Sequence, residues 1–191
     1  TGVLALVAIA VVMWAVPPVP EHLRAAQLEH GKTSWSAVLF DGQLLRLNAG
    51  VFVLHAAMMA LFVVVPVLLV QRGLPLGEHA KVYLPVMLLS FALMMPPIKA
   101  AERRGLVRYL LRGAMVLVAV SALGFAWAVR SEHSGVGVLG LCLLLFFVAF
   151  NVLEASLPSV TSRMAPPDAR GLAMGAYNTS HSFAFYVGGS F

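Results

Sequence analysis

Five long apolar runs follow one another along this chain, and they constrain its fold more than any other feature of the sequence. They cover residues 47–70, 82–98, 106–129, 136–158 and 171–191, with short polar gaps between them. A helix needs about 20 apolar residues to cross the hydrocarbon core of a bilayer. Backbone groups in lipid must bond within their own segment, and these runs are too long and too uniformly apolar for barrel strands. The runs therefore predict an all-α integral membrane protein.

The overall composition excludes a soluble domain. Hydrophobic residues make up 60% of the 191 residues and charged residues only 11%, whereas about 25% of a soluble domain is charged. The formal net charge of +5 does not indicate nucleic-acid binding, because the basic residues stand in the gaps and are not interleaved with aromatic ones. The one cysteine, Cys142, lies within an apolar run, and we expect it to be a packing residue.

Lysine and arginine are distributed unevenly over alternate gaps, and this predicts the orientation of the chain in the membrane. Ten of the 13 stand in the first, third and fifth gaps, namely Arg24, Lys32, Arg46, Lys99, Arg103, Arg104, Arg108, Arg112, Arg163 and Arg170. The second and fourth gaps hold only Arg72, Lys81 and Arg130. Because basic residues accumulate in cytoplasmic loops, the first, third and fifth gaps are predicted to be cytoplasmic.

The order of the segments predicts three regions. Residues 1–16 contain an apolar run of 14 residues, which we interpret as the end of a transmembrane helix from a preceding, N-terminal half. Residues 17–43 form the one long polar stretch and are expected to be a cytoplasmic linker between two halves. Residues 44–191 are expected to form a truncated C-terminal bundle of five helices.

One carboxylate stands inside an apolar run, where a charged group at the helix centre costs at least about 2.5–3.5 kcal/mol. Glu154 is three residues from Asn151, so the two share a helix face. Counted inward from Val136, Glu154 is expected about 27 Å along its helix, close to the depth of the basic loop. The leading hypothesis is a cytoplasmic gate, in which Glu154 pairs with Arg103 or Arg104. Proton binding by Glu154 and a purely structural role are the alternatives.

Two groups of polar residues are expected near the middle of the bilayer. His55 lies about 15 Å along its helix, and Tyr177, Asn178 and His181 lie about 10–16 Å along the last one. They are candidates, with Asn151, for lining a substrate cavity, and either histidine could join proton coupling. The alternative is hydrogen bonding between helices. The pair Gly171 and Gly175 is expected to allow a close helix approach.

Several short strings resemble one transporter family. They are Leu44–Asn48 (LLRLN), Glu78–Leu84 (EHAKVYL), Phe146–Asn151 (FFVAFN), Leu153–Ala155 (LEA), Leu157–Ser159 (LPS) and Gly171–Tyr177 (GLAMGAY). By these strings the chain resembles the major facilitator superfamily, in a YajR-type branch of the drug–proton antiporter group. The resemblance implies twelve helices in two halves, of which this chain would hold the end of helix six through most of helix eleven. It also implies alternating access and proton-driven export of small molecules.

The family's loop motif is only partly present. Glu102, Arg103 and Gly105 match it, but Ile98 stands in place of its first glycine and Leu106 in place of a later arginine. The resemblance therefore implies a degenerate copy of the motif in this half, with Glu102, Arg103 and Arg104 as gate candidates. In the last run, Asn178 and His181 stand where the branch usually has serine and glutamine.

Other function classes remain as alternatives. A nutrient importer of the same fold and a non-transporting structural membrane protein are both compatible with the runs. An enzyme is not expected, because the chain shows no catalytic cluster at one depth. No cofactor, metal set or nucleotide-binding loop is predicted. The expected partners are a small-molecule substrate, protons, the lipid bilayer and the N-terminal half of the same chain, with no nucleic acid. The expected location is the bacterial inner membrane.

Overall fold

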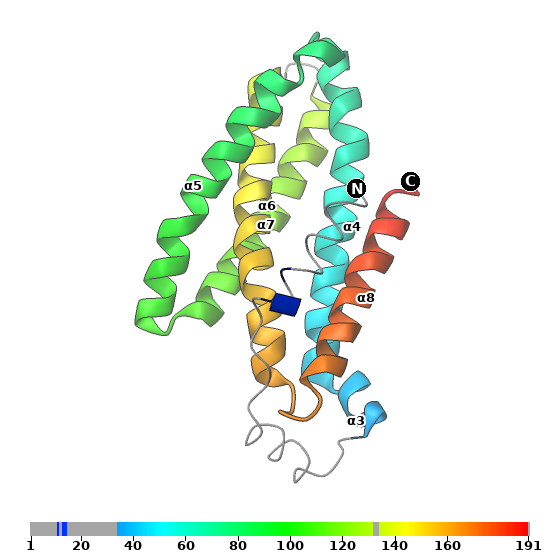
Figure 1. Ribbon diagram of the computed structural model, residues 1–191. Coiled ribbons are helices and arrows are strands. Elements are labelled where there is room, and N and C mark those ends of the chain that lie inside the picture. Colours follow the sequence, from blue (N-terminus) through cyan, green and yellow to red (C-terminus); the bar gives the residue numbers. More distant parts are fainter. Residues whose placement is uncertain (1–10, 12, 15–33, 132–133, 191) are drawn as a thin grey trace.

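The computed structural model describes residues 11, 13, 14, 34–131 and 134–190. This part of the chain consists of helices and the loops that join them (Figure 1). A short helix, α3 (Trp35–Leu39), precedes five long ones. The long helices are α4 (Gly42–Gln71), α5 (Ala80–Arg104), α6 (Val107–Arg130), α7 (Val136–Met164) and α8 (Arg170–Gly188), and one 3-10 turn, η1 (Leu76–Glu78), lies before α5. The prediction of an all-α membrane fold is confirmed. Apart from residues 11, 13 and 14, the expected helix in 1–16 lies outside the described residues, as does most of the expected linker.

Local chemistry sets where these helices begin and end. Asp41 caps α4, because its side-chain oxygen accepts hydrogen bonds from the backbone N–H groups of Gln43 and Leu44, both at 2.9 Å. Gly105 ends α5 in the left-handed conformation at φ 66°, which glycine adopts without strain. Pro158 lies inside α7, which continues to Met164, so the predicted end at residue 158 is wrong. A proline is tolerated there because membrane helices have other ways to satisfy the freed backbone groups.

Four segments of the described chain are long and apolar enough to cross a membrane. They are α4, α5 together with η1, α6 and α7. The fifth predicted span is a helix, α8, of 19 residues, and its rise of about 28 Å is close to the thickness of the hydrocarbon core. Its hydropathy is lower because polar residues occupy positions 178–182.

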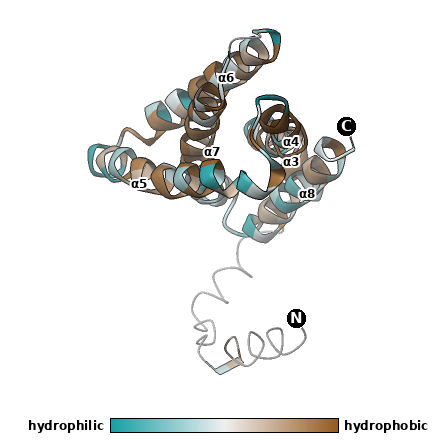
Figure 2. Ribbon diagram, turned by 90° about the horizontal axis from the view of Figure 1, so that it is seen from above, coloured by the Kyte–Doolittle hydropathy of each residue, from teal (hydrophilic) through white to brown (hydrophobic). Residues whose placement is uncertain are grey.

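Helix α7 lies at the centre of the bundle and packs against each of the other four long helices (Figure 2). Helix α8 packs mainly on α4, whereas α5 and α6 pack on the other side of α7. The outer part of the core contains Val65, Leu69, Leu139 and Phe146. The part nearer the cytoplasmic ends contains Val51, Leu54, Val152, Leu153 and Leu157.

Helices α4 and α8 are in tight contact at Gly188. A Cβ atom there would lie 2.6 Å from the carbonyl oxygen of Ala56 and 2.9 Å from the Cβ of Met59. At Gly171 and Gly175 an added Cβ would meet no atom of the described residues within 4 Å. The expected close approach at these two glycines is therefore wrong for the described bundle, and the small residue that permits it lies at the other end of α8.

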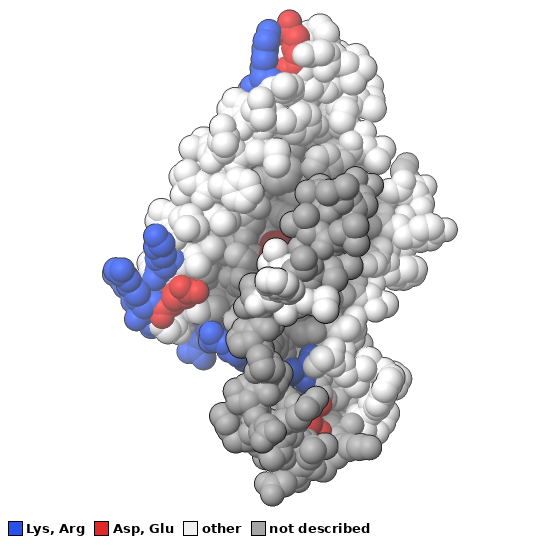
Figure 3. All heavy atoms as spheres, in the orientation of Figure 1, with Lys and Arg blue, Asp and Glu red and all other residues white. Residues whose placement is uncertain are grey.

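The charged residues agree with the predicted orientation. Figure 3 shows lysine and arginine side chains gathered toward the lower end of the molecule, where the α5–α6 and α7–α8 connections lie. At the upper end, Lys81 and Glu78 form an exposed ion pair, with Nζ 2.9 Å from Oε2. By the positive-inside rule, the lower end is predicted to face the cytoplasm.

Candidate functional site

His55 is a deeply buried titratable group at mid-depth in the bundle. It lies on α4 with only 1% of its surface exposed. Its Nδ1 is 2.9 Å from the carbonyl oxygen of Val51, one turn earlier on the same helix. Because a carbonyl only accepts hydrogen bonds, Nδ1 carries a hydrogen and donates it. The other ring nitrogen, Nε2, is thereby turned away from the α4 backbone.

Glu154, on α7, is the partner of that second nitrogen. Its Oε2 lies 3.1 Å from Nε2 of His55. Oε2 is shielded from solvent and accepts no well-aligned hydrogen bond, so the contact with His55 is an electrostatic one. The Glu154 side chain as a whole is 38% exposed. A buried imidazole on α4 thus faces a carboxylate on α7 that remains open to its surroundings.

His181 completes the cluster from α8. Its ring centroid is 3.8 Å from that of His55, with the rings inclined at 47°. Aromatic rings surround the two histidines: Phe150 is 5.3 Å from His55 between centroids, and Phe185 is 4.7 Å from His181. Three titratable side chains from three helices therefore meet in an otherwise apolar and aromatic environment.

The three residues lie at one level of the bilayer. Counting from the cytoplasmic helix ends at Gly42, Met164 and Arg170, His55 is about 20 Å, Glu154 about 15 Å and His181 about 17 Å along. The hydrocarbon core is about 30 Å thick. All three levels are close to its middle, so the prediction that His55 and His181 share a mid-depth level agrees with the structure.

The other cavity candidates take separate positions. Asn151 donates from Nδ2 to the hydroxyl of Ser90 on α5 at 3.0 Å, which ties α7 to α5 one turn from Glu154. Tyr177 is 2% exposed, and its hydroxyl has no hydrogen-bond partner in the described chain. Asn178 lies exposed on α8 and does not join the cluster.

The structure does not bring Glu154 to Arg103 or Arg104. Both arginines are exposed at the cytoplasmic end of α5, whereas Glu154 pairs with His55. The pairing with these arginines was expected for the closed inner side and stays a prediction. The expected distance of Glu154 from Val136 agrees with the structure, but α7 does not end near Pro158. It continues for ten residues beyond Glu154, which leaves the carboxylate near the middle of the bilayer and about 15 Å from the cytoplasmic end.

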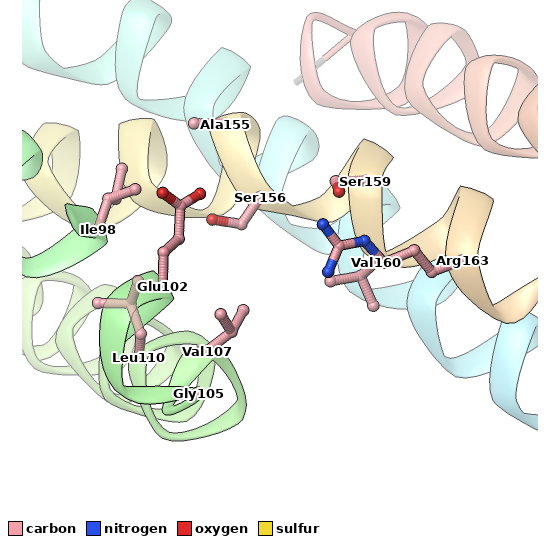
Figure 4. A pocket seen from close by; sticks show the side chains of 10 residues that line it. All are labelled: Ile98, Glu102, Gly105, Val107, Leu110, Ala155, Ser156, Ser159, Val160 and Arg163. Carbon is pink, nitrogen blue, oxygen red and sulfur yellow. The ribbon is translucent and has the colours of Figure 1, made fainter. Parts of the chain in front are cut away.

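A second polar feature lies nearer the cytoplasm. A cavity of about 460 Å³ opens between α5, α6 and α7, and Glu102, Ser156, Ser159 and Arg163 are among its lining residues (Figure 4). The carboxylate of Glu102 and the guanidinium of Arg163 both border this space (Figure 4), and they form no ion pair with one another. Of the expected gate residues, Glu102 therefore lines a cavity, and its opposing charge comes from α7.

Ser90 and the two phenylalanines escaped the reasoning from sequence. Ser90 is fully buried, and it is the one polar residue in the apolar run 82–98, which is a signal that could have identified it. Phe150 and Phe185 gave no signal, because aromatic residues are common throughout these runs and only the folded structure places them against histidines.

The fold and the cluster define a multi-pass membrane protein with a titratable centre between its helices. The sequence matches the model of the Major Facilitator Superfamily over residues 1–189. It is 37% identical over 189 residues to the inner membrane transport protein YajR of Escherichia coli (strain K12). The aligned region covers 99% of this chain and 41% of that protein. It is 29% identical over 143 residues to an uncharacterized transporter of Buchnera aphidicola subsp. Acyrthosiphon pisum, covering 75% of this chain and 36% of that protein. The chain belongs to the major facilitator superfamily.

The matches also show how much of the relatives' length this chain covers. The chain spans less than half the length of these relatives, 41% and 36% respectively. The resemblance found in the sequence is thus confirmed at the level of the family.

Proposed function

We propose that this chain holds most of the C-terminal half of a secondary transporter that exports small molecules across a bacterial inner membrane in exchange for protons. Family membership supports transport by alternating access, in which substrate binds near mid-depth between two helical halves. The name of the YajR relative, an inner membrane transport protein, supports the location.

The observation that carries the proposal is the meeting of His55, Glu154 and His181 at mid-depth. Ionisable residues in a membrane span are expensive, and they mark substrate or ion pathways and proton relays. A structural role alone does not require three titratable groups from three different helices in one place. The cluster therefore supports coupling to protons over a purely structural membrane protein.

The cytoplasmic end supplies a plausible inner gate. Glu102 lines the cavity between α5, α6 and α7, and Arg163 lines it from the opposite side. Movement of α5 toward α7 would bring these opposite charges together and reduce the cavity, while Arg103 and Arg104 lie next to Glu102 at the same helix end. We assign these four residues to the inner gate, and Glu102→Gln is expected to change the transport rate without abolishing proton coupling.

The direction of transport can be tested with inverted membrane vesicles that contain the full-length protein. The vesicles are acidified inside by respiration, and a panel of small organic compounds is added outside, one at a time. An exporter that exchanges substrate for protons makes the interior less acid when its substrate is added, which the recovery of acridine orange fluorescence reports. A proton-coupled importer gives no such recovery. If no compound causes recovery that depends on the protein, while uptake in right-side-out vesicles does depend on it, export is refuted.

A further inference from the structure

The hydrogen-bond partners of His55 determine where protons can reside in the cluster. Nδ1 must carry a hydrogen, because its neighbour at 2.9 Å is the carbonyl oxygen of Val51. In neutral His55 the second nitrogen, Nε2, is then a bare lone pair. That lone pair faces Oε2 of Glu154 at 3.1 Å. Two acceptors at this distance repel each other unless a proton lies on one of them.

From this geometry we infer that His55 and Glu154 together form the proton-binding site of the transporter. The pair holds one proton, on Nε2 or on Oε2, and the contact between α4 and α7 at this level persists only while that proton is bound. This inference rests on the proposed function and specifies which groups carry the coupled ion.

The charge balance of the pair follows directly. With the proton bound, the pair is neutral overall, either as imidazolium and carboxylate or as imidazole and carboxylic acid. When the proton leaves to water, the pair carries one negative charge near the middle of the bilayer. Such a charge is stable only if water or a cationic group reaches it. Release of the proton therefore favours separation of His55 from Glu154 and opening of the seam between α4 and α7.

The neighbouring groups limit the site to a single proton. From α8, His181 faces His55 at 3.8 Å between ring centroids, so a second proton on His181 would place two like charges side by side. Tyr177, also on α8, is a neutral hydroxyl. From α5, Ser90 contributes a hydroxyl that Asn151 already contacts. No lysine or arginine of the described helices forms an ion pair with Glu154, so among the described residues the positive charge that meets this carboxylate comes from the proton.

The difference in exposure gives the route of the proton. His55 is 1% exposed, whereas the Glu154 side chain is 38% exposed. The proton therefore enters and leaves through the carboxylate of Glu154. His55 is the inner member that keeps the proton in the bundle once it has arrived.

The test measures the distance between α4 and α7 as a function of pH in the full-length protein. Spin labels are placed at the exposed positions Leu45 and Ser159, in a background with Cys142→Ala, and their separation is measured by pulsed electron paramagnetic resonance. We expect a short distance at acid pH and a longer one at alkaline pH. The steepness of the change with pH should correspond to the release of one proton.

Two substitutions of the same residue separate this inference from a general loss of structure. In Glu154→Gln the amide N–H can donate to Nε2, which imitates the protonated carboxyl, so the short distance is expected at every pH. In Glu154→Ala no group reaches Nε2, so the long distance is expected at every pH. Glu78→Gln is the matched control, because it removes an exposed acid at the opposite end of the bundle, and it should leave the transition unchanged. A transition that persists in Glu154→Gln, or one with the slope of two protons, overturns the inference.

The distance measurement does not depend on transport, so the two proposals can fail separately. If the labels respond as expected but no substrate exchanges with protons in vesicles, the proposed exporter function is wrong and the proton site stands. If Glu154→Gln still exchanges substrate for protons as the unchanged protein does, the proton site is wrong and the exporter function stands.

Discussion

The contact between α4 and α8 at Gly188 provides a sharp test of the packing. In Gly188→Ala the new Cβ would lie 2.6 Å from the carbonyl oxygen of Ala56, whereas ordinary contacts begin at 3.4 Å. The two helices must therefore separate by at least about 0.8 Å at this level. The atom contacted on α4 belongs to the backbone, which cannot rotate away as a side chain can. Inserting one carbon into a well-packed contact destabilises by about 1–3 kcal/mol.

The measurement is the free energy of unfolding of the full-length protein in mixed micelles titrated with a denaturing detergent. Gly175→Ala on the same helix and Gly113→Ala on α6 are the controls, because an added Cβ meets no described atom within 4 Å at either position. Each control should be neutral or stabilising by up to about 1 kcal/mol, since alanine favours a helix over glycine. If Gly188→Ala unfolds with the same free energy as these controls, the close approach of α4 and α8 is refuted.

Three further substitutions test other contacts by the same unfolding measurement. Arg72→Ala removes two hydrogen bonds, of 2.9 and 2.8 Å, from the guanidinium to carbonyl oxygens at the end of α6. It should lower the free energy of unfolding by about 1–3 kcal/mol. An unchanged free energy of unfolding would show that these contacts contribute nothing to stability. Asp41→Ala removes the cap of α4 and should cost about 0.5–2 kcal/mol, with Asp41→Asn as the variant that preserves it. Ser90→Ala removes the acceptor of Asn151 and should cost about 0.6 kcal/mol, and a loss of several kcal/mol would contradict this simple account.

The positions of the helices could be predicted from the sequence, because lipid requires each apolar run to satisfy its own backbone. The ends were less accurate. Helix α4 begins at Gly42, five residues before the apolar run 47–70, because Asp41 caps it. Helix α7 passes through Pro158, since a proline in a membrane helix bends or loosens it without ending it.

The candidate site was predicted in part. His55 and His181 were both placed near mid-depth by counting residues from the helix ends, and the structure brings their rings together. The partner of Glu154 could not be found this way. His55 and Glu154 belong to helices far apart in the sequence, and hydropathy gives the depth of a residue but not the side of the helix that faces a given neighbour.

Pro158 has a consequence for the residue one turn before it. Because proline has no N–H, the backbone carbonyl of Glu154 lacks its usual donor within α7. Glu154 therefore offers a main-chain oxygen as well as two carboxylate oxygens within a few ångströms, beside an imidazole that offers one bare nitrogen when neutral. Several hydrogen-bond acceptors therefore lie close together at Glu154. These acceptors can be satisfied by hydrogen-bond donors such as water, a bound proton or the N–H groups of a transported molecule.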